Sequence, residues 1–295
     1  MPVDLSIELF NQLVVPVLTY GCEVWGFSDL NQMEILQRKF IKTILCLNNR
    51  TPNNMVYGES GEYPLSCIVN MRMINFYMRL VNGKQSKLSC ILYKVSRKQE
   101  EYFGLTYKWL DHIKHILANI GLYNVWQFNG NGLPNEYVKN IVKSRTQVLY
   151  QQYWLEEKST HAYCSFYDLI KREFKIEKYL IDLSYQQRIT ICKFRCRSNS
   201  LPISKSRFSN DDEESYLCPL CRENEIGDEY HYLFRCPFFN DERKKYLPDI
   251  PSHPDVYHMI QLFDNNEANH VCKLSIFIKL IMAIFEHRDE WELGL

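Results

Sequence analysis

The sequence contains few glycines and few prolines, with 11 of each among 295 residues. Because these residues supply many of the tight turns that an all-β protein needs, their scarcity favours helices over sheets. No run approaches the roughly 20 consecutive apolar residues of a membrane-spanning helix. The first residues, MPVDLSIELFNQ, lack the basic segment of a signal peptide. We therefore expect a folded protein of the cytoplasm or nucleus with no membrane segment.

A net charge is also lacking, since 35 Lys and Arg residues balance 35 Asp and Glu residues. Any contact with nucleic acid must therefore come from local clusters of basic side chains. The 11 cysteines, without a signal peptide, indicate a reducing compartment. In such a compartment most cysteines are buried apolar side chains, and a suitably spaced subset can bind metal.

Apolar residues at three- and four-residue spacing predict helices along most of the chain. The clearest case is 31–47, where apolar positions recur at Met33, Leu36, Phe40, Ile44 and Leu47. Further helices are expected over 4–25, 64–81, 86–98, 106–120, 134–158, 164–175, 178–197, 238–246, 254–264 and 267–290. A Gly-rich loop, 128–134, separates two helical halves. The predicted fold class is all-α.

Three cysteines and one histidine near the C-terminus have the spacing of a metal site, Cys218-x2-Cys221-x9-His231-x4-Cys236. Three thiolates and one imidazole fill all four positions of Zn²⁺ and leave none for a catalytic water, so the pattern predicts a structural zinc site. The alternatives are a redox-active Cys-x-x-Cys pair and chance proximity. The absence of a βαβ pattern around the pair argues against the redox reading.

The stretch just before this cluster, 183–210, contains six basic residues and no acidic one. Such a local excess is typical of segments that follow a phosphate backbone. The predicted nucleic-acid contacts are Arg188, Lys193, Arg195, Arg197, Lys205 and Arg207. The alternative is a solvated helix face paired with the acidic run 211–214. A weaker basic stripe, with Arg38, Lys39 and Lys42, is either a second contact or an ordinary amphipathic surface.

Four tracts together suggest a family: PVLTYGCEVWG (16–26), QMEILQRKFIKTIL (32–45), TPNNMVYGESGEYPL (51–65) and CPLC…GDEYHYLFRCPFF (218–239). Their order resembles the C-terminal third of the reverse transcriptase of a LINE-type (non-LTR) retrotransposon. The resemblance implies a thumb-like helical region over 1–128, a helical connector with the basic run over 129–202, and a CCHC zinc knuckle packed on C-terminal helices over 203–295.

The resemblance also implies a role in binding template RNA or target DNA, without polymerase activity in this chain alone. The family's catalytic aromatic-x-Asp-Asp motif is not matched by FSNDDEES, and the palm and endonuclease would lie upstream of Met1. Some relatives carry a nuclease after the knuckle, and Pro248-Asp249 followed by Glu267 matches its pattern only loosely. Two further readings remain: a zinc-dependent protein-interaction module that uses the apolar helix 267–290, and a fragment with no function.

Overall fold

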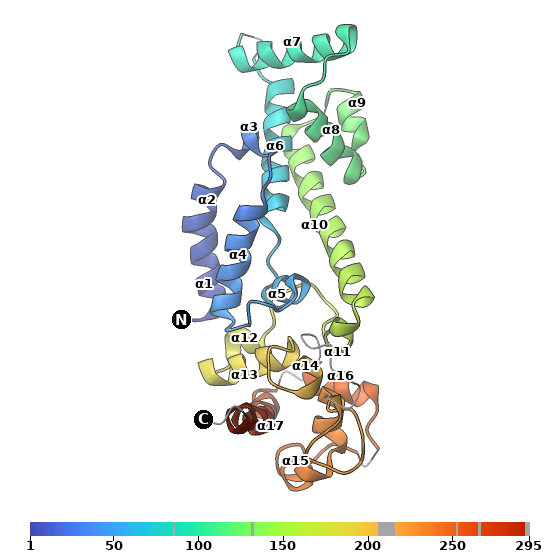
Figure 1. Ribbon diagram of the computed structural model, residues 1–295. Helices are drawn as coiled ribbons and strands as arrows, with labels where there is room; N and C mark the ends of the chain where they lie inside the picture. Colours follow the sequence, from blue (N-terminus) through green and yellow to red (C-terminus); the bar gives the residue numbers. More distant parts are fainter. Residues whose placement is uncertain (85, 131–132, 206–215, 252, 265–266, 293–295) are drawn as a thin grey trace. The chain divides into compact units, whose positions relative to one another are not determined.

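The computed structural model describes residues 1–84, 86–130, 133–205, 216–251, 253–264 and 267–292, except for the side chains of residue 268 and of 287–292. These residues are mostly helical and include no strand (Figure 1). Leu217 and Ile226 form an isolated antiparallel bridge. The prediction of an all-α fold is confirmed for the described part of the chain.

The chain divides into two compact units, each built from segments that are not consecutive. Unit 1 comprises Met1–Ile7, Lys39–Glu62 and Glu156–Leu295, and unit 2 comprises Glu8–Arg38 and Tyr63–Leu155. Three of the boundaries fall inside the helices α1 (Val3–Leu9), α4 (Asn31–Ile44) and α10 (Asn135–Thr160). The sequence indicated three consecutive regions and gave no sign of this interleaving.

Unit 2 is organised around α6 (Leu65–Val81), which begins directly after Pro64. A Cβ at Gly26 would lie 2.4 Å from Val69 Cγ1, so the glycine permits α3 to approach α6 closely. Gln37 is buried, donates to Tyr63 O over 2.9 Å and accepts from Leu65 N over 3.2 Å, which joins α4 to the start of α6. The other helices of this unit are η1 (Phe10–Val14), α2 (Val15–Leu18), α3 (Cys22–Trp25), α7 (Leu88–Phe103), α8 (Lys108–Asn119) and α9 (Tyr123–Gln127).

Unit 1 contains the short α5 and all of the described elements after α10. Ser184 and Gln187 form a capping box that starts a new helix, so the single helix expected over 178–197 is two helices. The elements are α5 (Asn53–Ser60), η2 (Ala162–Cys164), α11 (Ser165–Ile170), α12 (Tyr179–Asp182), α13 (Tyr185–Arg195), α14 (Pro202–Lys205), η5 (His231–Arg235), η6 (Pro237–Phe239), α15 (Asn240–Tyr246), α16 (Val256–Asp264) and α17 (Ala268–Glu292).

The apolar side of α17 lies inside unit 1. Its predicted stripe is buried, with exposed fractions of at most 3% at Leu274, Phe277, Ile278, Ile281 and Phe285. The helix contacts α13 and α15, and the ring of Phe277 meets that of Phe239 at 6.0 Å. The surface that the interaction-module reading assigned to a partner is therefore covered by the chain itself.

Among the described residues, no single helix combines the length and apolar composition that crossing a membrane requires. The pair Val256–Asp264 and Asn269–Glu286 meets that requirement only jointly, across a bend of 115°.

A buried network of charges joins α5 to the later helices of unit 1. Arg195, which is 1% exposed, donates from Nε and Nη2 to Glu59 Oε1 over 3.1 and 3.0 Å, and Tyr179 donates to Glu59 Oε2. Glu177 lies 3.4 Å from Arg195 and 2.5 Å from Lys171. Burial alone raises the pKa of Glu177, but Arg195 and Lys171 outweigh it and hold that pKa below its usual value. Glu177 therefore stabilises the fold at neutral pH, and this contribution is lost as the pH falls through its lowered pKa.

Replacing Glu59 by glutamine should destabilise unit 1, because Arg195 would keep its buried charge and lose its closest carboxylate. Removing one partner of a buried pair costs about 3–5 kcal/mol, and we expect the lower end because Glu177 remains nearby. The measurement is the free energy of unfolding in denaturant. Glu173→Gln is the control, since Glu173 forms an exposed pair with Lys175 and its loss should cause no measurable change. Equal free energies of unfolding for Glu59→Gln and Glu173→Gln would contradict the structural role of the buried pair between Glu59 and Arg195.

Candidate metal centre and nucleic-acid interface

The structure brings the four predicted metal ligands together. One ligand atom from each of Cys218, Cys221, His231 and Cys236 lies within 4.8 Å of all the others. Cys218 Sγ lies 3.9 Å from Cys236 Sγ, and Cys221 Sγ lies 3.4 Å from His231 Nε2. Cys221 is partly exposed and the other three are buried. Among the described residues, this is the one group with such a geometry.

A short turn positions the two N-terminal ligands. Cys218 N–H donates to Glu225 O over 2.8 Å, and Gly227 N–H donates to Tyr216 O over 2.7 Å, which folds the chain back on itself. A Cβ at Gly227 would lie 2.3 Å from the hydroxyl of Tyr232. The sequence suggested that this glycine serves the chain reversal, whereas the structure requires it for the close approach of Tyr232.

A single π-helical turn, η5, positions the other two ligands. His231 N–H donates to Asp228 Oδ1 over 2.7 Å at its start, and Cys236 N–H donates to His231 O over 2.7 Å at its end. This i→i+5 bond returns the chain to one side of the turn, which accounts for the four residues between the two ligands. The guanidinium of Arg243 on α15 holds the end of the turn, donating to Leu233 O over 2.8 Å and to Cys236 O over 3.0 Å.

The histidine ring is oriented by a carboxylate. His231 Nδ1 lies 2.8 Å from Glu225 Oε2, so Nδ1 carries the proton in this bond and Nε2 is directed to the cysteines. A carboxylate behind a ligating histidine fixes its tautomer and increases its basicity. Burial lowers the pKa of His231, but hydrogen bonds to Cys218 and Glu225 outweigh it and raise that pKa.

The thiols differ in acidity. Burial raises the pKa of Cys218, yet hydrogen bonds from His231 and the main-chain N–H of Leu220 outweigh it and lower the pKa to about 6. Burial raises the pKa of Cys236 to about 12 and also raises that of Cys221, with the neighbouring Cys218 adding to both. The thiolate of Cys218 therefore forms readily. The thiolates of Cys221 and Cys236 form beside it only when a cation offsets the negative charge. The cluster can bind a metal ion.

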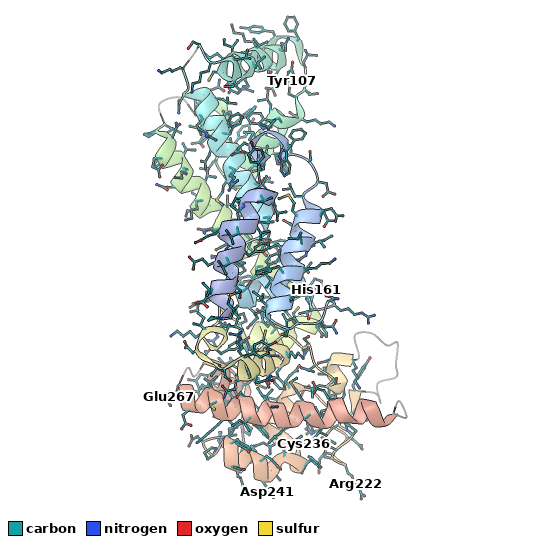
Figure 2. All side chains as sticks on the ribbon, turned by 90° about the vertical axis from the view of Figure 1, so that its left-hand side faces the viewer. Tyr107, His161, Arg222, Cys236, Asp241 and Glu267 are labelled. Carbon is teal, nitrogen blue, oxygen red and sulfur yellow. The ribbon has the colours of Figure 1, made fainter. Side chains whose placement is uncertain are left out.

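The loosely matched nuclease residues do not form a second metal cluster. Asp249 and Glu267 line a common cavity of about 260 Å³ beside Lys273. Figure 2 labels Glu267, which lines this cavity, and Cys236, which belongs to the cysteine–histidine cluster. In the described part of the chain, the group of side chains that could hold a metal ion is Cys218, Cys221, His231 and Cys236.

Three of the predicted nucleic-acid contacts, Arg188, Arg195 and Arg197, are buried in the interior of unit 1. Arg195 is bound by Glu59, and Arg197 donates from Nε and Nη2 to Glu229 over 2.7 and 2.9 Å. Arg188 is 7% exposed and donates to Met1 O over 2.8 Å. The sequence assigned these arginines to phosphate contacts, and the structure instead places them in internal hydrogen bonds. The sequence did not reveal these partners, because Glu59, Glu229 and the carbonyl of Met1 lie 136, 32 and 187 residues away from the arginines that they bind.

The remaining predicted contacts have mixed positions. Lys193 is half-buried, Lys205 and Lys39 are exposed, and Arg207 lies outside the described residues, as does the acidic run 211–214. Arg38 pairs with Glu34 at 3.3 Å in unit 2. Lys42 is 8% exposed and donates to Asn49 O over 2.6 Å. Lys39, Lys193 and Lys205 thus remain as accessible cations of unit 1.

A further basic segment lies on α10 and was missed from the sequence. Residues 137–155 contain no acidic residue, and Lys139, Lys143 and Arg145 are exposed. Lys139 and Lys143 are four residues apart and share a side of the helix. The exposed Tyr137 and Tyr153 add rings on which unpaired bases can stack. The absence of acidic residues is the signal that would have identified this segment.

The chain matches no protein-family model, no curated protein and no solved structure. The site is therefore classified by its donor atoms and geometry alone. It is a cluster of three cysteines and one histidine in a helical protein.

Replacing Glu225 by glutamine should weaken metal binding. A neutral amide accepts a weaker hydrogen bond from His231 Nδ1 than a carboxylate does, and it increases the basicity of the ring less. Loss of such a partner costs about 10- to 100-fold in metal affinity. The measurement is a competition titration against a chromophoric chelator. Glu223→Gln, an exposed neighbour, is the control and should bind metal like the wild type. Equal affinities of the two variants would contradict the role of Glu225.

Proposed function

We propose that Cys218, Cys221, His231 and Cys236 bind one Zn²⁺ ion with a structural role. The observation that carries this proposal is the convergence of three sulfurs and one imidazole nitrogen within 4.8 Å. Thiolate and imidazole ligands suit Zn²⁺, whereas Mg²⁺ and Ca²⁺ take oxygen ligands. Four protein ligands leave no position for a reacting water, so the ion stabilises the surrounding turn and takes no part in hydrolysis.

We further propose that the chain binds nucleic acid, as the corresponding region of a LINE-type reverse transcriptase does by resemblance. The order of the four sequence tracts and the CCHC order of the ligands support this reading. The half-buried Lys193 and the exposed Lys205 of unit 1, together with residues 137–155 of α10 in unit 2, are the proposed phosphate contacts. The ligand is template RNA or target DNA, and no catalytic role is assigned to this chain.

The zinc-stabilised interaction module is the competing function. Its support from the sequence was the apolar stripe on α17. That stripe is buried, and the exposed large apolar side chains of the described part of the helix are Ile276 and Leu280. The nucleic-acid reading retains the exposed basic side chains of α10. Residues 137–155 contain no acidic residue, and Lys139 forms an exposed pair with Glu136, just before this segment, at 3.4 Å. We therefore favour nucleic acid over a protein partner.

The double variant Lys139→Glu/Lys143→Glu, at two positions on one side of α10, should bind single-stranded RNA and DNA at least about tenfold more weakly than the wild type, because two attractive contacts become repulsive. The slope of log affinity against log salt should fall by roughly 0.7 for each lost phosphate contact. Fluorescence anisotropy with labelled oligonucleotides over a salt series measures both quantities.

Lys94→Glu/Lys98→Glu on α7 is the matched control. It makes the same charge change at exposed positions of unit 2, next to Glu100 and Glu101, and should reduce affinity less. Undetectable wild-type binding to RNA and DNA at low salt would refute the nucleic-acid function and favour a protein partner. Equal losses in both double variants would show that α10 is not the contact.

A further inference from the structure

A cationic cavity of about 520 Å³ lies in unit 1, away from the metal ligands in sequence. It is formed by two segments, 42–54 and 157–164. Its lining residues are Lys42, Asn49, Arg50, Thr51, Pro52, Asn53, Asn54, Glu157, His161, Ala162, Tyr163 and Cys164. His161, just after the end of α10, marks its position in Figure 2. The volume lies within the range of small-molecule sites in proteins.

Positive charge predominates in the lining. Lys42 is nearly buried, and its ammonium is held by Asn49 O at 2.6 Å, which fixes a cation in the wall. Arg50 follows on the exposed loop between α4 and α5. Glu157 is the one carboxylate in the lining, and it lies 3.6 Å from His161 Nε2. The lining therefore contains two cationic side chains, Lys42 and Arg50, and one carboxylate, which lies beside His161.

The N-terminus of α5 adds to this positive charge. The helix begins at Asn53, and its N-cap residue, Pro52, makes no side-chain cap, while Met55 N–H donates to Asn54 Oδ1 over 2.8 Å. First-turn N–H groups and the helix dipole favour an anion at such a position. Directly before it, Thr51 lines the cavity at 5% exposure, and its hydroxyl has no hydrogen-bond partner among the described residues. A buried hydroxyl without a partner is costly unless a ligand supplies one.

We propose that this cavity binds the phosphate monoester of a nucleotide. Lys42 and Arg50 neutralise the phosphate, and the start of α5 and Thr51 donate hydrogen bonds to its oxygens. The volume exceeds that of a phosphate, and Pro52, Ala162 and Tyr163 provide walls for the attached sugar and base. The proposal rests on the nucleic-acid function only for the source of the phosphate, which is a strand terminus or a free nucleotide.

The test compares single-stranded RNA oligonucleotides of one sequence with a 5′-phosphate, a 3′-phosphate or neither, bound to the zinc-loaded full chain. A terminal phosphate should tighten binding about tenfold, as expected for new hydrogen bonds to a charged group. Adenosine 5′-monophosphate and inorganic phosphate should compete for the gain. Arg50→Gln and Thr51→Val should abolish it, and thermal melts check that both variants remain folded.

Lys39→Gln is the matched control, since Lys39 is an exposed lysine on the same helix as Lys42 and does not line the cavity. It should keep the preference for the phosphorylated strand. Salt-dependent RNA binding with no gain from a terminal phosphate, and no competition by the small phosphates, would overturn this proposal and leave the nucleic-acid function intact. Binding of adenosine 5′-monophosphate without any binding of RNA would support the cavity and refute that function.

Discussion

The convergence of three thiols and one imidazole within 4.8 Å is the interaction around which residues 216–236 are arranged. Its turns and π-helical turn are too short to be stable on their own, and each is arranged to present a ligand atom. Glu225 and Arg243 then hold the ring of His231 and the carbonyl of Cys236. Since the pKa of Cys218 is lowered and those of Cys221 and Cys236 are raised, a bound cation would favour the thiolate form of all three.

Internal pairing of arginines is the second organising feature of unit 1. Glu59 and Glu229 bind Arg195 and Arg197, so two cations in the most basic stretch of the sequence serve the fold. The first pair joins α5 to α13, and the second joins the end of α13 to the segment that carries the metal ligands. Basic character in the sequence is therefore an unreliable guide to surface charge here, and the exposed lysines and α10 are better candidates for phosphate contacts.

The helical class, most helix positions and the convergence of Cys218, Cys221, His231 and Cys236 were predictable, because apolar periodicity and cysteine–histidine spacing are local properties of the sequence. The helix α5 was missed because Asn53, Asn54 and Gly58 are weak helix formers, and its burial stabilises it instead. The interleaved units and the partner of Arg195 were not predictable, since Glu59 is 136 residues away. The capping box at Ser184 was visible in the sequence and would have divided the helix correctly.

The most direct test of the central claim is X-ray absorption at the zinc edge on protein purified without added metal. A structural Cys3His site predicts one zinc per chain, with three sulfurs at about 2.3 Å and one nitrogen at about 2.0–2.1 Å. A shell dominated by oxygen and nitrogen, or a chain that retains well under one zinc, would contradict the account.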